Sequence, residues 1–273
     1  TVMPQPTIGQ SHVDAILTQF SISYLQRAEA FVAPRVFPIV PVDKQSDKYF
    51  IFDQDAFFRD TMKPRGLSQE SAGSGYKVST DSYACIKYAL HKDIDDDIRA
   101  NYDQPLDPDR NATQYLTQMS LLRMENQWVT DYFGTGIWGT DVAGVTSGPD
   151  TTHAVYWSDY AASTPIRDIR TGIKTVLQST GFKPNRLVLG YEVAEVLMDH
   201  PDIVSRLKTT DTKIVTVQLL ASLFGIEEVM VAEAVQNTAV EGGTASYSFI
   251  HGKKALLAYA APTPAVEMPS AGY

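Results

Sequence analysis

Apolar residues change their spacing several times along the chain, and each change marks an expected element. A short amphipathic helix is predicted within residues 12–31 from apolar residues at helical intervals: Val13, Ile16, Leu17, Phe20 and Tyr24. The stretch from Ala33 to Pro41 then places three prolines among hydrophobic residues. Because proline lacks an N–H and disfavours helix in the residue before it, this stretch is expected to be extended. Its apolar side chains need a surface to cover.

Residues 49–88 have the pattern of a long strand pair with a polar tip. Lys48 to Phe52 is β-rich, and Tyr76 to Tyr88 partly alternates, as a returning strand would. The polar segment between them contains Lys63-Pro64-Arg65-Gly66 and further glycines. A tip of about twenty residues is unusual in a compact domain, so we expect an arm that lies across a neighbouring subunit. A disordered surface loop is the alternative.

The clearest helix is predicted over residues 111–133, with Asn111 as its cap and Gly134 as its stop. Its expected buried stripe follows i, i+3, i+4 spacing: Ala112, Tyr115, Leu116, Met119, Leu122, Val129, Tyr132 and Phe133. The acidic run His91 to Arg99 precedes it. Because the ligand spacing and glycine of a calcium loop are missing, the first turn of a helix is favoured over a metal site.

From Ser163 onward the pattern becomes α/β. Helices are expected from Pro165 to a stop at Gly181, from Tyr191 to Met198, and from Thr216 to a stop at Gly225. The expected strands are short and apolar: 186–190, 226–232, 247–250 and 255–259.

Composition narrows the classes of function. The 273 residues have a net charge of −9, and the pI is near 5.0. These values argue against binding of nucleic acid through clustered Lys and Arg side chains. The lone Cys85 is expected to be a small buried hydrophobe. No stretch has the ~20 apolar residues of a membrane span, and no signal peptide is visible, so synthesis in the cytoplasm is expected.

Motifs for catalysis are missing from the sequence. It contains no Gly-rich phosphate loop, no His-Glu-x-x-His pair and no Gly-x-Ser-x-Gly elbow. His200 stands before a proline at a helix end, where a capping role is favoured over catalysis. We therefore predict that the chain is not an enzyme and has no catalytic, cofactor-binding or metal-binding residues. A small-molecule enzyme built on residues 163–260 is the alternative from another class, and it would need an apolar pocket with converging polar groups.

Several segments in order resemble one structural family. They are Lys183–Gly190, Leu197–Pro201 before Leu207-Lys208, Leu219–Ala221 with Phe224-Gly225, and Val229–Ala232. They are similar to the axial domain of major capsid proteins of tailed bacteriophages with the Hong Kong 97 fold. Ala33 to Pro38 looks like the entry from arm to core in one branch of that family, so the resemblance covers nearly the whole chain.

The resemblance implies an α+β fold of the Hong Kong 97 type with five parts. They are an N-terminal arm (1–46), an extended β-hairpin loop (47–90), a peripheral domain (91–162) with a spine helix (111–133), an α/β axial domain (163–262), and the start of a return to the peripheral domain (263–273). It also implies a coat protein that assembles into hexamers and pentamers of an icosahedral shell around double-stranded phage DNA. A shell of encapsulin type, enclosing a cargo enzyme, is the alternative.

The expected partners follow from that implied role. The chain would bind other copies of itself, scaffolding, portal and decoration proteins, and packaged DNA without sequence-specific contacts. It would use no cofactor and no membrane, and it would be made in the host cytoplasm and end in the virion. The hypothesised subunit-interface residues come from the arm and the loop: Phe31, Val36, Phe37, Ile39, Phe57, Phe58, Lys63 and Arg65. For the four arm residues, the chain's own core is an equally open interpretation.

Overall fold

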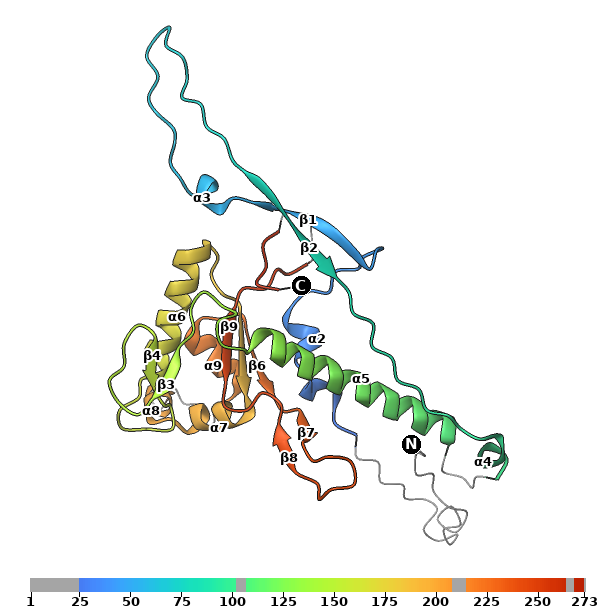
Figure 1. Cartoon of the computed structure of the whole chain (residues 1–273). Coiled ribbons are helices and arrows are strands. Elements are labelled where there is room, and N and C mark those ends of the chain that lie inside the picture. The colour runs from blue at the N-terminus through green and yellow to red at the C-terminus, as the bar shows by residue number, and fades with distance from the viewer. Residues whose placement is uncertain (1–24, 102–106, 208–214, 264–267, 273) are drawn as a thin grey trace. The chain divides into compact units, whose positions relative to one another are not determined.

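The computed structural model describes residues 25–101, 107–207, 215–263 and 268–272 (Figure 1). Clustering of contacts divides the chain into two compact units. Unit 1 comprises residues up to Ile39 and from His91 onward, and unit 2 is Val40–Leu90. Most of the helix predicted within residues 12–31 lies outside the described residues, and the part inside them holds a single 3₁₀ turn, η1 (Ala28–Ala30).

Unit 1 is a mixed α+β structure with small sheets. Its helices are α2 (Ala33–Val36), α4 (Asp96–Asn101), α5 (Pro108–Tyr132), α6 (Pro165–Thr180), α7 (Tyr191–Asp199), α8 (Pro201–Leu207) and α9 (Val217–Phe224). Its strands are β3 (Ala143–Val145), β4 (His153–Val155), β5 (Arg186–Gly190), β6 (Glu228–Ala232), β7 (Val235–Asn237), β8 (Tyr247–Phe249) and β9 (Ala255–Ala258). The sequence did not predict α8 or β7.

A three-stranded sheet in the order β6-β5-β9 forms the centre of unit 1. The middle strand pairs in parallel with β6, placing Val188 opposite Met230, and antiparallel with β9, placing Val188 opposite Leu256. Leu187 and Leu189 alternate with Val188, and all three are at most 2% exposed. Both faces of the sheet are therefore covered, which agrees with the prediction of a short buried strand.

One face of the sheet carries α6, which precedes β5 in sequence, and α7, α8 and α9, which connect β5 to β6. Leu187 and Leu189 of β5 and Val229 of β6 pack against residues of α6, α7, α8 and α9. The helix ends are set by local chemistry: Gly181 and Gly225 take left-handed conformations after α6 and α9, as predicted. The other helix–strand boundaries of this region also fall within two residues of the predicted ones.

The opposite face of the sheet is covered by two segments from the first half of the chain. Val188, Met230 and Leu256 pack against α2 and against the last turns of α5, through Val36, Phe37, Trp128 and Phe133. In Figure 1, α5 and α2 lie next to each other beside the sheet, and the two elements contact each other. The arm is thus a layer of the core of unit 1.

Two predictions for this layer are wrong in detail. The Ala33–Pro41 stretch is not extended throughout, because Ala33–Val36 forms α2 with Pro34 in its first turn, where a missing N–H costs nothing. The long helix begins at Pro108 and is capped by Asp107, whose carboxylate accepts the N–H groups of Asp109 and Arg110.

The predicted buried stripe of α5 is only partly correct. Tyr115 is exposed, whereas Gln118, Glu125 and Trp128 are buried. Hydrophobic periodicity overlooked Gln118 and Glu125 because these two residues are polar.

Glu125 joins α5 to the arm. Its side chain is 0% exposed, and its two oxygens accept the backbone N–H groups of Val32 (3.1 Å) and Ala33 (2.9 Å). These are N–H groups at the start of α2, which have no partner within that helix. A buried carboxylate without such bonds would be strongly destabilising, so the junction fixes the arm and the helix together.

His251 lies against the same carboxylate. Its Nε2 atom is 3.4 Å from Oε1 of Glu125, both side chains are fully buried, and neither ring nitrogen forms a hydrogen bond with any described residue. Its ring also contacts Trp128 and Phe133. Burial lowers the pKa of His251 to about 4. Burial also raises the pKa of Glu125, although the two backbone hydrogen bonds oppose that rise. Both shifts favour the uncharged forms.

Unit 2 is a β-hairpin with a long tip. Strands β1 (Ser46–Phe52) and β2 (Val78–Ala84) pair antiparallel from Ser46–Ala84 to Phe52–Val78. A single short helix, α3 (Gln54–Phe57), follows β1, and Asp53 caps it by accepting the N–H of Asp55. The predicted strand pair and polar tip are therefore present, with the returning strand shorter than expected.

We expect Glu125→Gln to lower the free energy of unfolding by about 2 kcal/mol. The amide oxygen of Gln can still accept one backbone N–H of the arm, but the amide NH₂ group then faces the other backbone N–H and cannot accept it. Urea unfolding of the purified variants measures this. Glu241→Gln, which makes the same change at an exposed position, should leave stability within about 0.5 kcal/mol of wild type. Equal unfolding midpoints for the two variants would contradict the role given to Glu125.

The free energy of unfolding should depend on pH through the protonation of His251. An unfolded chain protonates His251 near pH 6.5, whereas the folded chain does so only near pH 4. As pH falls between these values the unfolded state gains the proton first, so this residue lowers the free energy of unfolding by up to about 3 kcal/mol. Glu125 acts in the opposite sense, because its raised pKa lets the folded state take a proton first.

Replacing His251 with Gln should therefore flatten the dependence of the unfolding free energy on pH between about 4 and 6.5. The exposed His91→Gln serves as the control and should keep the wild-type slope. His200, whose pKa burial also lowers, remains in both variants. Parallel pH profiles for wild type and His251→Gln would refute the assignment.

Candidate assembly surfaces

The hairpin of unit 2 exposes its strands on both sides. Every residue of β1 is exposed, and β2 is exposed apart from the half-buried Tyr83. The exposed large hydrophobic residues of this unit are numerous: Val40, Val42, Tyr49, Phe50, Ile51, Phe52, Phe57, Phe58, Met62, Leu67, Tyr76, Val78, Ile86, Tyr88 and Leu90. A two-stranded sheet is marginally stable alone in water, and an apolar surface of this extent is typical of an interaction site.

The loop residues singled out from the sequence all lie at the surface. Phe58 is 59% exposed, and Lys63 and Arg65 are exposed near the tip. Arg65 donates from Nε to the carbonyl oxygen of Gln69 at 2.5 Å, which folds the tip locally. Phe57 is 61% exposed, yet its ring contacts Phe52 and Tyr76 within the unit.

The arm residues divide into two groups. Phe31, Val36 and Phe37 are at most 6% exposed and lie in the core of unit 1. For these three the interface hypothesis is replaced by the alternative that the sequence left open, intramolecular core. Ile39 is 66% exposed and is available to a partner.

A buried serine and histidine form the arrangement closest to a catalytic pair. The Oγ atom of Ser163 is 2.9 Å from Nε2 of His200, and both residues are buried. However, Nδ1 of His200 accepts the backbone N–H of Asp202, so the neutral ring carries its proton on Nε2 and donates it to Ser163. Ser163 in turn donates to the carbonyl oxygen of Asp159.

This chain of hydrogen bonds runs in the wrong direction for catalysis, since a general base must accept the serine proton. His200 instead caps the start of α8. The expected capping role is therefore present, although the helix that it caps was not predicted.

Other candidate chemistry is limited. Asp96 and Asp97 occupy the first turn of α4, as predicted for the acidic run. Across the described residues, no three His, Cys, Asp or Glu side chains gather in a way that could hold a metal ion.

Cys85 is exposed, which contradicts the prediction of a buried hydrophobe. It follows β2 in the hairpin unit, which has no core of its own. None of the described helices combines the length and apolarity needed to cross a membrane.

Some surface residues were overlooked in the sequence. Met62 and Leu67 flank the Lys63–Gly66 segment and are almost fully exposed. The signal was available, because isolated large apolar residues in a polar, Gly- and Pro-containing segment have no local core to enter. Phe52 and Tyr76 were assigned only to strands, although they stabilise Phe57 through ring contacts.

Comparisons with known proteins agree on one class. The major capsid protein of Pseudomonas phage JBD67 is 30% identical over 237 residues, which cover 84% of this chain and 71% of that protein. The major capsid protein of Burkholderia phage BcepMu is 25% identical over 234 residues, covering 82% and 69%. No family model matches the chain.

A solved structure is similar in fold. The crystal structure of a phage-related protein from Bordetella bronchiseptica superposes with a TM-score of 0.61 at 22% identity, covering 90% of this chain and 78% of the other. The hairpin with its exposed apolar side chains and the two capsid relatives both indicate a protein that assembles. With 30% identity across more than two thirds of a known coat protein, the chain belongs to the family of bacteriophage major capsid proteins and has a structural role in a capsid shell.

Proposed function

We propose that this chain is a coat subunit of the Hong Kong 97 type, which forms the hexamers and pentamers of an icosahedral shell around double-stranded phage DNA. The observation that carries the proposal is the similarity to the JBD67 major capsid protein along 84% of the chain. The exposed hairpin supports it, because a shell must be held by surfaces that an isolated subunit leaves uncovered. Scaffolding, portal and decoration proteins are further proposed partners.

The parts of the subunit are assigned as follows. Residues 1–46 form the arm, 47–90 the extended loop, 91–162 the peripheral domain with α5 as its spine helix, 163–262 the axial domain, and 263–273 the start of the return. Two features support this division: residues 40–90 form a unit of their own, and the sheet β6-β5-β9 with its helices follows residue 163.

The contacts between subunits are assigned to exposed residues. Ile39 of the arm and Phe57, Phe58, Lys63 and Arg65 of the loop meet neighbouring copies. The aromatic side chains supply apolar area, while Lys63 and Arg65 face acidic groups and add little each. Phe31, Val36 and Phe37 act indirectly, by seating the arm in the core of unit 1.

The first experiment is the mass of the native particle, from light scattering combined with electron microscopy of the same sample. We expect icosahedral particles of megadalton mass. Particles from infected cells should contain nucleic acid; particles that instead contain a protein cargo would identify a compartment of encapsulin type. A chain that stays monomeric at high concentration, with scaffolding protein present, would overturn the proposal.

Deleting residues 57–74 should yield a soluble, folded subunit that no longer forms stable shells. The deletion removes the tip while keeping both paired strands of the hairpin, and the core of unit 1 contains none of the deleted residues. Circular dichroism and urea unfolding test the fold, and sedimentation tests assembly. Normal shells from the deleted chain would show that the tip does not hold subunits together.

A further inference from the structure

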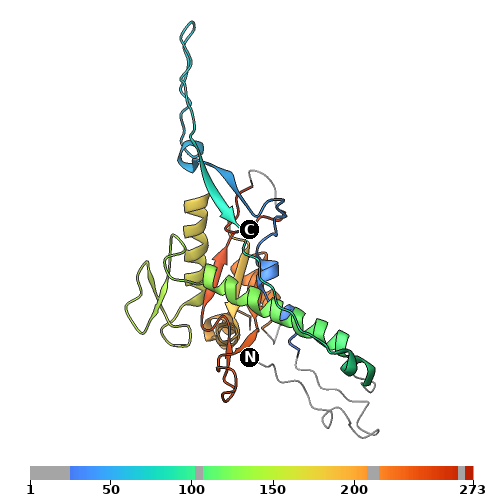
Figure 2. The same ribbon diagram turned by 45° about the vertical axis from the view of Figure 1, so that its right-hand side comes forward.

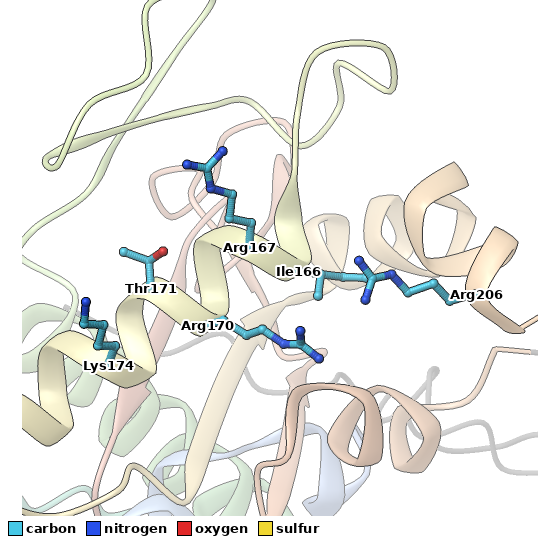
Figure 3. Close-up of a pocket in the computed structure, with 6 residues that line it drawn as sticks. All are labelled: Ile166, Arg167, Arg170, Thr171, Lys174 and Arg206. Atoms are coloured by element: carbon cyan, nitrogen blue, oxygen red, sulfur yellow. The ribbon is translucent and has the colours of Figure 1, made fainter.

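Helix α6 presents a row of cations to solvent. Arg167, Arg170 and Lys174 recur at i, i+3 and i+7, so they share one face of the helix, and all three are exposed. Together with Arg206 of α8 they surround an open hollow of about 320 Å³ floored by Ile166 (Figure 3). In a chain with a net charge of −9, this local excess of positive charge is unusual.

The three cations of α6 have no carboxylate partner within salt-bridge distance among the described residues. The two acidic side chains nearby are already engaged. Asp168 accepts from Nε1 of Trp157 at 3.0 Å, and Asp202 lies 3.7 Å from Arg206. The row is therefore a cationic surface whose counter-charge comes from outside the described chain.

Helix α7 carries a row of the opposite sign with the same spacing. Glu192, Glu195 and Asp199 also recur at i, i+3 and i+7. Glu195 and Asp199 are exposed and have no cationic partner in the described part of the chain, while Glu192 is 3.7 Å from the exposed Lys253. Both helices pack on the same face of the sheet through their apolar sides, so both charged rows point away from the core.

We propose that the cationic row of α6 docks against the acidic row of α7 of a second copy of this chain. The inference rests on the proposed function and deepens it, because it names the surface that joins axial domains within a ring. Two different patches on each subunit make a head-to-tail contact, which closes into rings when the rotation between copies allows it. Hexamers and pentamers are such rings.

The matched spacing makes the contact specific. Whether the two helices run parallel or antiparallel, the middle members of the rows, Arg170 and Glu195, face each other. Rise along a helix is 1.5 Å per residue, so the outer pairs lie about one turn to either side of this central pair. Each exposed ion pair is weak, but a ring repeats the set at every interface.

DNA is the competing ligand for the cationic row. Its phosphates would satisfy the same guanidinium groups. The second copy is favoured because the acidic row on α7 matches the cations in number and spacing, and because the acidic chain as a whole repels a polyanion. An interface between copies also explains why all members of the two rows except the half-buried Glu192 are exposed in an isolated subunit.

Charge reversal in single and paired variants tests the proposal. Arg170→Glu and Glu195→Arg should each reduce the yield of rings and shells by about tenfold, because each places like charges at every interface. The double variant restores opposite charges at every interface and should recover yields close to wild type. Sedimentation and electron microscopy give the yields, and circular dichroism shows that the exposed substitutions leave the fold intact.

Two control variants change charge by the same amount at exposed positions outside the rows. Lys183→Glu and Glu241→Arg should assemble like wild type. Assembly of both single variants at the wild-type level would overturn the inference while leaving the proposed function intact. Normal shells with less packaged nucleic acid would overturn it in favour of DNA. A wild-type chain that forms neither rings nor shells would overturn both.

Discussion

The carboxylate of Glu125 accepts two backbone N–H groups of the arm in a fully buried site, and the packing of unit 1 is organised around it. The side chain comes from the spine-like helix α5, the N–H groups come from α2, and the neighbouring His251 comes from the segment before β9. Three distant parts of the chain therefore meet at one polar group. Because an unpaired carboxylate in this position would be costly, only an arm seated in this way is compatible with the burial of Glu125.

Local signals in the second half of the chain were strong enough to predict the three strands of its central sheet and helices α6, α7 and α9, although not α8 or β7. Gly181 and Gly225 end helices in the left-handed conformation, Pro165 begins one, and the apolar run 187–189 forms the central strand. The arm was harder, because its helix depends on partners far away in sequence. Val32 and Ala33 are bonded by a residue more than ninety positions later, and periodicity carries no information about such a contact. The polar Glu125 and Gln118 were missed for the same reason.

The candidate surface residues, too, could be predicted only where no partner distant in sequence decides their exposure. Phe57, Phe58, Lys63 and Arg65 lie in a segment whose composition alone indicates exposure, and they are exposed. Phe31, Val36 and Phe37 have the same apolar character as a sticky arm, but the residues that receive them come late in the chain. Val36 and Phe37 pack on the face of the sheet formed by Val188, Met230 and Leu256, and Phe31 packs against Ala234 and Ile250. Sequence pattern identifies an apolar segment, whereas only tertiary structure decides whether its partner belongs to the same chain.

The seating of the arm on that sheet face has a consequence for biosynthesis. Residues 32–37 leave the ribosome early, but the strand β9 that completes their binding surface ends at residue 258. At about 5–20 residues per second, the arm waits on the order of ten seconds or more before its site exists. During that interval its apolar side chains are exposed to other nascent chains and to chaperones. Chains released before β9 is made cannot bury their arm, so incomplete subunits are marked by an uncovered apolar segment that sets them apart from finished ones.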